Sequence, residues 1–346
     1  MESSTECELA GFIGLMRVGV LGVGRIGTLH AHTLAAHQSV ERLVLFDADA
    51  ARARDVATSL AAEVAESPEE LLGEVDAVVV AVPTAFHAEL VHACLSAGVP
   101  TMCEKPVALD LADLHKVVEH AGDSGIPLQV GFQRRFDAGY REARRLCSNG
   151  ALGRIYTFRL AGHDPAPPHA AYIATSGGIF RDLHIHDFDV IRFVLGREVE
   201  EVVAYGAVLG FPEFAEADDY DSTVAAIRLV DGTLGVLSGG RHDPLGYDIR
   251  MELFGSRDSI SVGLDGRTPL RSVEPSMRPF EGPAYPDFQR RFEDAYIAEV
   301  ATFLEVAAGH EDNPCTAKDA YQALRIATAC HISAHEHRPV RLEEVA

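Results

Sequence analysis

A glycine-rich turn near the start of the chain limits what this sequence can fold into. Apolar residues 17–21 predict a short buried strand directly before the turn, and a helical pattern follows to about residue 37. Between a strand and a helix, the spacing G-x-G-x-x-G is typical of a dinucleotide-binding unit. Free amide groups at the helix N-terminus would then face a pyrophosphate. The turn consists of Gly22, Val23, Gly24, Arg25, Ile26 and Gly27.

An acidic residue supports this interpretation. The second predicted strand, residues 43–46, ends in Asp47, about twenty residues after Gly27. A carboxylate at this position binds the adenosine ribose hydroxyls and repels a 2′-phosphate. The sequence therefore predicts NAD as the cofactor and disfavours NADP.

Strand and helix signals then alternate, with further apolar strands predicted at 76–82, 99–103 and 127–132. Alternation of this kind predicts an α/β Rossmann domain with a doubly wound parallel sheet, over residues 17–133. Ligands of such sheets bind beyond the carboxyl ends of the strands. Four residues fall at such ends, namely Asp47, Pro83, Lys105 and Arg134.

The pattern changes in residues 134–346. Strand signals follow one another without helices between them, and Asp231-Gly232 is a hairpin turn signal. Such a series predicts an α+β domain with a largely antiparallel open sheet. Two helices, at about 288–307 and 317–331, close the chain. Residues 1–16 are interpreted as a tail, which is either disordered or upstream of a true start at Met16.

Composition excludes several classes of partner. The formal net charge of −22 argues against nucleic acid and anionic membranes, which need a positive protein surface. No apolar run approaches the roughly 18–20 residues of a membrane helix. The six cysteines contain no C-x-x-C pair, and the acidic start of the chain does not resemble a secretory signal. We therefore expect a cytoplasmic protein with reduced thiols.

The stretch that begins at Gly177-Gly178 combines acid and imidazole groups in an apolar helical pattern. Asp182 and His186 are four residues apart, so one continuous helix would place them on one face, with Asp189 beyond. A carboxylate beside an imidazole in an apolar setting suggests proton transfer. The alternative is structural, with Asp182 as a helix cap and His186 as a core histidine.

Several motifs together resemble the Gfo/Idh/MocA oxidoreductases, and among them the inositol 2-dehydrogenases. The resemblance covers nearly everything after Met16. It rests on the glycine turn with Asp47, on Glu104-Lys105-Pro106, on residues 131–137 (GFQRRFD) and on Asp182-x-x-x-His186-x-x-Asp189. Residues 246–249 (GYDI) and 287–292 (DFQRRF) are similar to the inositol enzymes in particular.

The resemblance implies roles for residues at matching positions. It implies a catalytic set of Lys105, Asp182 and His186. Beside the glycine turn and Asp47, it implies cofactor contacts from Pro83, His87, Glu104, Lys105 and Arg134. Beside the catalytic set, it implies substrate contacts from Arg134, His163, Asp189 and Tyr247. Two features depart from the inositol pattern, namely the loop at 164–168 and Phe288. These departures bear on the identity of the substrate and not on the type of reaction.

The expected reaction is oxidation of a secondary hydroxyl of a cyclitol or sugar, as in conversion of myo-inositol to keto-inositol. His186 would act as the base, Asp182 would orient it, and Lys105 would stabilise the alkoxide. A structural salt bridge between Lys105 and Glu104 is the alternative role for that lysine. The sequence also leaves open a dehydrogenase of another sugar or anhydro-sugar, a non-catalytic dinucleotide-binding regulator, and a metal site of Asp182, His186 and His163.

The open sheet also leads to an expectation about assembly. Too few helices are predicted to cover both of its faces, so we expect sheet-to-sheet packing between subunits. This would give a homodimer or, by resemblance, a homotetramer.

Overall fold

The computed structural model describes residues 14–275 and 282–345, and they fall into two compact units. The first unit contains the chain up to Glu104 together with residues 119–129 and 299–316. The second contains residues 105–118, 130–298 and 317–346. The units therefore interleave along the chain, whereas the sequence predicted a single division after residue 133.

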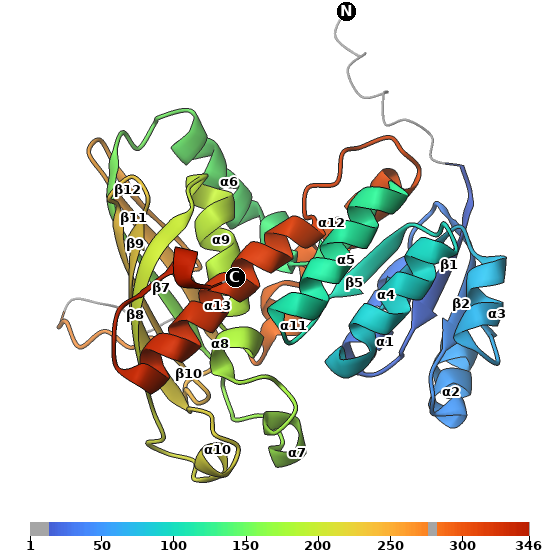
Figure 1. The fold of residues 1–346 in the computed structure, drawn as a ribbon, viewed down its shortest axis with the longest axis horizontal. Coiled ribbons are helices and arrows are strands. Elements are labelled where there is room, and N and C mark those ends of the chain that lie inside the picture. Colours follow the sequence, from blue (N-terminus) through green and yellow to red (C-terminus); the bar gives the residue numbers. More distant parts are fainter. Residues whose placement is uncertain (1–13, 276–281, 346) are drawn as a thin grey trace, which may run out of the picture. The chain divides into compact units, whose positions relative to one another are not determined.

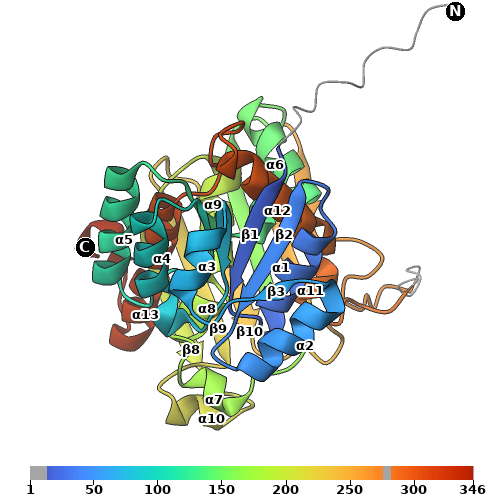
Figure 2. The same cartoon turned by 90° about the vertical axis from the view of Figure 1, so that its right-hand side faces the viewer.

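The first unit has a six-stranded sheet in the order β3-β2-β1-β4-β5-β6, which confirms the predicted Rossmann topology. Figure 2 shows β1, β2 and β3 of this sheet side by side. All its strands are parallel. The strands are β1 Met16–Leu21, β2 Val40–Phe46, β3 Glu63–Val64, β4 Ala77–Val80, β5 Thr101–Glu104 and β6 Leu128–Gly131. The helices that follow them are α1 Arg25–Ala35, α2 Ala50–Leu60, α3 Pro68–Glu74, the 3₁₀ turn η1 Thr84–Phe86, α4 His87–Ser96 and α5 Leu111–Ser124.

Side chains of β1 alternate between the two faces of this sheet, as the period of a strand requires. Val18 and Val20 belong to a buried cluster with apolar residues of α1, α2 and the later helix α12 (Glu293–Ala307). Gly19 lies on the other face, where Leu71 of α3 fills the space above it. Both faces are therefore covered, and the central strands are buried from Val18 to Leu21 in β1 and over all of β4.

The second unit has a mixed, mostly antiparallel sheet of seven strands, ordered β12-β11-β7-β10-β9-β8-β13. This confirms the largely antiparallel sheet; the pairing of β7 with β10 is parallel. The strands are β7 Ile155–His163, β8 Val199–Ala207, β9 Ser222–Leu229, β10 Leu234–Gly240, β11 Asp248–Gly255, β12 Ser259–Val262 and β13 Val340–Arg341. Its remaining elements are η2 Gln133–Phe136, α6 Ala138–Ser148, α7 Ala170–Ile173, α8 Ile179–Asp182, α9 Ile185–Leu195, α10 Glu213–Glu216, α11 Phe288–Arg291, α13 Ala317–Glu336 and η3 Leu342–Glu344.

Helices α9 and α13 lie against one face of the seven-stranded sheet (Figure 1). The inward positions of β9, such as Ala225 and Ile227, are buried, while the alternate positions are exposed. One face of the sheet is therefore core and the other is open.

Two predicted helices are interrupted. The helix expected from residue 179 onward is divided into α8 and α9, with Leu183 and His184 between them. The helix expected over 288–307 breaks at Phe292, which caps α11. In neither case does a proline or glycine stand at the break, so the apolar spacing alone gave no signal.

Within the described residues, no helix is long and apolar enough to cross a membrane. The predicted tail falls mostly on residues outside that range, while Met16 opens β1 and is buried.

Candidate active site

The glycine turn in the first unit has the shape that a pyrophosphate needs. Gly22 has φ +90°, and a Cβ there would lie 2.8 Å from the backbone of Ala81. A Cβ at Gly27 would lie 1.9 Å from the carbonyl oxygen of Gly22. Gly24 caps α1 without a side-chain bond, and no atom lies within 4 Å of where its Cβ would be. Two glycines thus serve packing, and the third leaves room for a phosphate at the helix N-terminus.

Asp47 is held at the carboxyl end of β2, directly beside this turn. Its Oδ2 accepts a hydrogen bond from the amide of Val23 at 2.9 Å, and its Oδ1 accepts one from Asp49 at 2.8 Å. The guanidinium of Arg52 lies 3.4 Å away. A ribose diol placed here would find a fixed acceptor, so the donor set fits NAD.

Pro83 and His87 lie beyond the end of β4. Pro83 caps the 3₁₀ turn η1, and His87 begins α4. The His87 ring is buried, and its Nε2 lies 2.7 Å from the carbonyl oxygen of Val82. This bond shapes the turn at the strand end, so His87 acts on the backbone there.

A cluster of three buried groups lies in the first unit near Glu104. Nε2 of His30 is 2.7 Å from Oε1 of Glu104, and one carboxylate oxygen of Glu299 lies within 4.8 Å of both groups. Burial and the charge of Glu104 raise the pKa of Glu299 well above its ordinary value. His30 is thus a packing residue of the first helix, and Glu299 was not predicted from the sequence.

Two of the predicted catalytic residues, Lys105 and Asp182, are in direct contact in the second unit. Lys105 Nζ donates to the main-chain oxygen of Asp182 at 2.7 Å and lies 3.3 Å from its Oδ1. Tyr172 donates its hydroxyl to the same Oδ1 at 2.8 Å, and Arg241 Nη1 lies 3.0 Å from Oδ2. Burial opposes ionisation of Asp182, but Lys105 and Arg241 outweigh it and lower its pKa to about 2.

His186 is the second residue of α9, and its ring packs edge-on against Phe132. Burial, with Lys105 and Arg134 nearby, lowers its pKa well below the ordinary value. A neutral imidazole can accept a proton. The expected orienting bond from Asp182 is not among the bonds of the described residues, because the break between α8 and α9 turns that carboxylate toward Lys105, Tyr172 and Arg241.

Two arginines of the 131–137 motif, Arg134, which was predicted as a site residue, and Arg135, form buried ion pairs with acids of α9. Arg134 binds Asp187, whose other oxygen is 2.8 Å from Nδ1 of His184. Arg135 binds both oxygens of Asp189. Asp189 is fully buried in this pair, and its expected contact with the substrate stays a prediction. Arg134 is 1% exposed, and its pair with Asp187 is made through Nη1.

His163 and Tyr247 come together through the sheet. His163 ends β7 and pairs in register with Asp248 at the start of β11, directly after Tyr247. Burial lowers the pKa of His163 and raises that of Tyr247. Both lie in the unit that holds Lys105, Asp182 and His186.

Sequence reasoning missed Arg241 and Tyr172. Arg241 stands in a stretch, Gly239-Gly240-Arg241-His242, that has no recognisable motif. Tyr172 lies beyond the proline-rich loop, which the sequence marks only as a departure from the inositol pattern. A buried arginine could be found only from the tertiary structure.

A Rossmann unit with an acid beside its glycine turn, followed by a lysine–aspartate–histidine set, defines an NAD-dependent oxidoreductase. Two family models match the chain: the Gfo/Idh/MocA oxidoreductase family with an NAD-binding Rossmann fold at residues 16–132, and the Gfo/Idh/MocA C-terminal domain at residues 140–261. The chain belongs to the Gfo/Idh/MocA family, among its inositol-type dehydrogenases acting on CH–OH groups with NAD.

Among similar proteins is myo-inositol dehydrogenase Hyg17 of Streptomyces leeuwenhoekii, 44% identical over 92% of this chain and 97% of that protein. Myo-inositol 2-dehydrogenase of Thermotoga maritima is 38% identical over 95% of this chain and 99% of that protein. The crystal structure of scyllo-inositol dehydrogenase from Lactobacillus casei with NAD(H) and scyllo-inositol superposes with a TM-score of 0.86 at 28% identity, covering 95% and 99%.

Proposed function

We propose that this protein oxidises a secondary ring hydroxyl of myo-inositol to the ketone, as an inositol 2-dehydrogenase. The observation that carries the proposal is the Lys105–Asp182 contact in the same unit as a neutral, buried His186. The names of the relatives at 44% and 38% identity support myo-inositol as the substrate.

Each residue of the set has a distinct role in this proposal. His186 accepts the hydroxyl proton, for which its lowered pKa keeps the imidazole neutral. Lys105, held by Asp182, offers its ammonium to the oxygen on which negative charge develops. Asp182 remains ionised beside two cations and fixes the lysine. His163 and Tyr247 are proposed to hydrogen-bond the remaining ring hydroxyls.

The cofactor would be held by the glycine turn and Asp47, with Pro83 and Glu104 at neighbouring strand ends. NAD, when bound, supplies the acceptor for the hydride that leaves the same carbon as the proton-bearing oxygen. Glu104 ends β5, and Lys105 follows it directly in the chain. A proposed cofactor contact and a proposed catalytic residue are therefore adjacent in the sequence.

Competing substrates belong to the same chemistry. Scyllo-inositol differs from myo-inositol in the orientation of one hydroxyl, and a relative 33% identical carries the name scyllo-inositol 2-dehydrogenase. Sugars and anhydro-sugars offer the same kind of hydroxyl. A non-catalytic regulator is disfavoured because the three catalytic side chains are all present.

A substrate screen tests the proposal. The purified protein is given NAD with myo-inositol, scyllo-inositol, other cyclitols and aldoses, and absorbance of the reduced cofactor is followed. We expect the highest kcat/KM with myo-inositol. A higher kcat/KM with a sugar would mean that the sugar, and not myo-inositol, is the substrate. If NAD binds by calorimetry but no polyol is turned over, the dehydrogenase proposal is contradicted.

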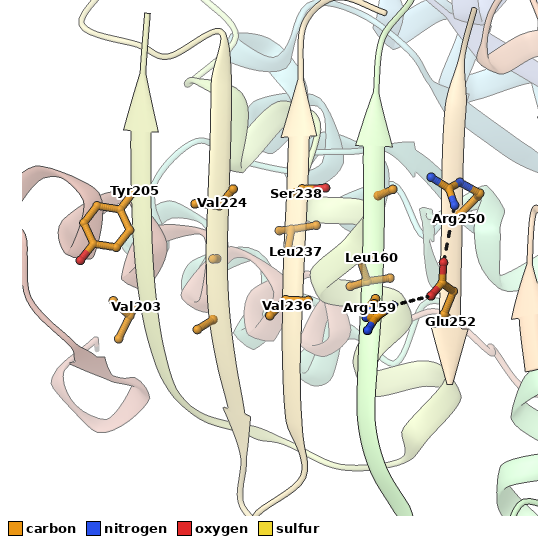
Figure 3. A pocket seen from close by; sticks show the side chains of 13 residues that line it. Arg159, Leu160, Val203, Tyr205, Val224, Val236, Leu237, Ser238, Arg250 and Glu252 are labelled. Carbon is orange, nitrogen blue, oxygen red and sulfur yellow. Dashed lines mark hydrogen bonds and ion pairs between the residues drawn. The ribbon is translucent and has the colours of Figure 1, made fainter. Parts of the chain in front are cut away.

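We also propose that the open face of the seven-stranded sheet pairs with a second copy of the chain. Two rows of side chains cross this face through neighbouring strands (Figure 3). One row runs Tyr205, Val224, Ser238, Ala161 and Arg250; the other runs Val203, Ala226, Val236, Arg159 and Glu252.

The composition of the two rows favours self-association. Tyr205, Val224 and Val236 are each at least 50% exposed and lie over adjacent strands. Arg159 and Glu252, at the far end, carry opposite charges 3.5 Å apart. Two copies of this face can pack together with the apolar side chains of one copy against those of the other. The acidic side chain of each copy would then lie opposite the basic side chain of its partner.

The cytoplasmic location expected from the sequence stays a prediction.

A further inference from the structure

Arg241 is a deeply buried cation of the second unit that the mechanism above does not use directly. Its side chain is 3% exposed. It follows the last residue of β10, and its amide donates to the carbonyl of Asp221 at 2.8 Å. An arginine buried to this degree costs several kcal/mol unless acids compensate it.

Strand pairing brings Arg241 beside Asp164. Strands β7 and β10 are the parallel pair of this sheet, with His163 opposite Gly240. Their carboxyl ends therefore lie at the same edge, and the residues that follow, Asp164 and Arg241, are neighbours. The amide of Asp164 donates to the carbonyl of Gly240 at 2.9 Å, and Arg241 Nη1 lies 3.1 Å from Asp164 Oδ2.

The same nitrogen reaches the catalytic aspartate. Nη1 of Arg241 is 3.0 Å from Oδ2 of Asp182, while Lys105 and Tyr172 occupy Oδ1. We propose that Arg241 is a positioning residue that joins the carboxylates of Asp164 and Asp182, and so keeps Asp182 ionised as the anchor of Lys105. The effect on turnover rests on the proposed function; the effect on Asp182 does not.

Charge balance around Arg241 supports this assignment. Asp164 and Asp182 both interact with the two cations Arg241 and Lys105, whereas Asp219 interacts with Arg241 and Arg181. Burial raises the pKa of Asp164 and of Asp219, whereas that of Asp182 is lowered. Asp182 is thus the acid on which both cations converge, with the hydroxyl of Tyr172 as its third partner.

Asp164 gives the arrangement a second consequence. It opens the loop at 164–168, where this chain departs from the inositol pattern, and Tyr172 beyond that loop is bonded to Asp182. The first residue of the loop is therefore tied to the catalytic aspartate through Arg241, and Tyr172, four residues after the loop, is bonded to it directly. Changes at Asp164 should alter substrate affinity more than the ionisation of Asp182.

Titration of Asp182 tests the proposal without any substrate. Protein labelled with ¹³C at aspartate carboxyls is followed by NMR between pH 4 and 8 (about the range in which the fold persists), and Asp182→Asn identifies the signal. In the native protein we expect no titration of Asp182 in this range. In Arg241→Gln its pKa should rise by about 2–3 units, within the usual effect of removing an opposite charge, which brings the titration of Asp182 into this pH range.

Three further variants make the result specific. Arg241→Lys keeps the charge and should restore part of the low pKa. Asp164→Asn frees Arg241 for Asp182, so the titration should stay low while KM for the substrate rises. Arg192→Gln is the matched control, because Arg192 also bridges two acids, Glu198 and Asp319, outside the site; it should leave the titration of Asp182 and the pH profile unchanged.

In Arg241→Gln the kcat/KM profile should show a loss of activity at the pH where the titration places Asp182. An unchanged titration in folded Arg241→Gln would overturn the proposal. If that variant does not fold, Arg241→Lys and Asp164→Asn decide: equal upward shifts in both would mark Arg241 as merely structural. A native protein that turns over no polyol but shows these titrations would refute the proposed function alone.

Discussion

The ammonium of Lys105 donates to the main-chain oxygen of Asp182 at 2.7 Å and lies 3.3 Å from that residue's Oδ1. One aspartate thus holds the lysine through its backbone and its side chain together. Removing the Asp182 carboxylate would leave the carbonyl contact in place. The position of the ammonium therefore depends on how α8 ends, and its electrostatic setting depends on the carboxylate.

Replacing Lys105 by alanine should lower kcat by roughly 10²–10³-fold, as loss of a group stabilising an oxyanion does. Methylammonium added to the assay should recover part of the rate, because it restores a cation without the side chain. Lys116→Ala serves as control, since Lys116 is exposed and pairs with Asp113 on α5. A normal kcat in Lys105→Ala would exclude the electrostatic role.

Substitution of His186 by alanine should reduce kcat by roughly 10²–10⁴-fold, the usual contribution of a positioned base. The residual rate should rise with pH as hydroxide substitutes for the imidazole. In the native enzyme the pKa of His186 is lowered by burial, so the base stays neutral and active below about pH 6.5, where a free imidazole protonates. His310→Ala, at an exposed histidine, should leave the profile unchanged.

The same lowered pKa affects stability with a definite sign. Below about pH 6.5 the unfolded chain binds a proton at His186 that the folded chain does not, so the free energy of unfolding falls as pH drops through this range. If His186→Ala keeps the native kcat and pH profile, His186 is a structural core histidine, which is the alternative stated in the sequence analysis.

Cofactor preference should follow Asp47. Its carboxylate is fixed by the amides of Val23 and Asp49, so a 2′-phosphate would meet a negative charge that cannot turn away. Asp47→Ser should raise kcat/KM with NADP and lower it with NAD, because Arg52 already stands 3.4 Å from this position and would face the phosphate. The double variant Asp47→Ser with Arg52→Gln is the control. It should have a low kcat/KM with NAD and with NADP, because neither the carboxylate nor the guanidinium is present. Equal native turnover with NAD and NADP would contradict the assignment.

The Rossmann unit could be predicted because its signals are local. Strand, glycine turn, helix and Asp47 lie within about thirty residues, and each has its own backbone requirement. The mostly antiparallel sheet was also predictable, since consecutive strands and the Asp231-Gly232 turn need no tertiary information. The parallel pairing of β7 with β10 was not, because these strands are separated by more than seventy residues.

The site was harder to predict where it depends on contacts between distant residues. The spacing of Asp182 and His186 suggested a helical pair, but a break after Asp182 sends the carboxylate to Lys105 and Arg241. Asp189 carries the same motif signal as Asp182, yet it is buried against Arg135. Sequence spacing identifies the candidate site residues. Which oppositely charged side chain each of them pairs with depends on the tertiary packing.

Glu299 should make the fold sensitive to alkali. Burial and the nearby Glu104 raise its pKa well above the ordinary value, so the folded chain keeps a proton that the unfolded chain loses above about pH 4.3. Stability from this group is complete below that pH and declines as pH rises through the folded pKa. In Glu299→Gln, urea unfolding from pH 5 to 9 (about the range of interest) should therefore show a weaker decline.

Glu305→Gln is the matched control for that measurement, since Glu305 lies on the same helix but pairs with His310 at the surface. Its unfolding should follow the native pH dependence. Identical slopes for Glu299→Gln and the native protein would mean that Glu299 is ionised when folded.

A charge placed on the open sheet face should separate the subunits. Val236 is 50% exposed and lies in the row between Ala226 and Arg159, so Val236→Arg would place like charges together at the centre of a sheet-to-sheet contact. Light scattering at micromolar concentration should give a dimer or tetramer for the native protein and a smaller mass for the variant. Val273→Arg, at a 91% exposed residue outside both rows, should keep the native mass. A monomeric native protein would refute the interface, and an unchanged mass in Val236→Arg would move it to another surface.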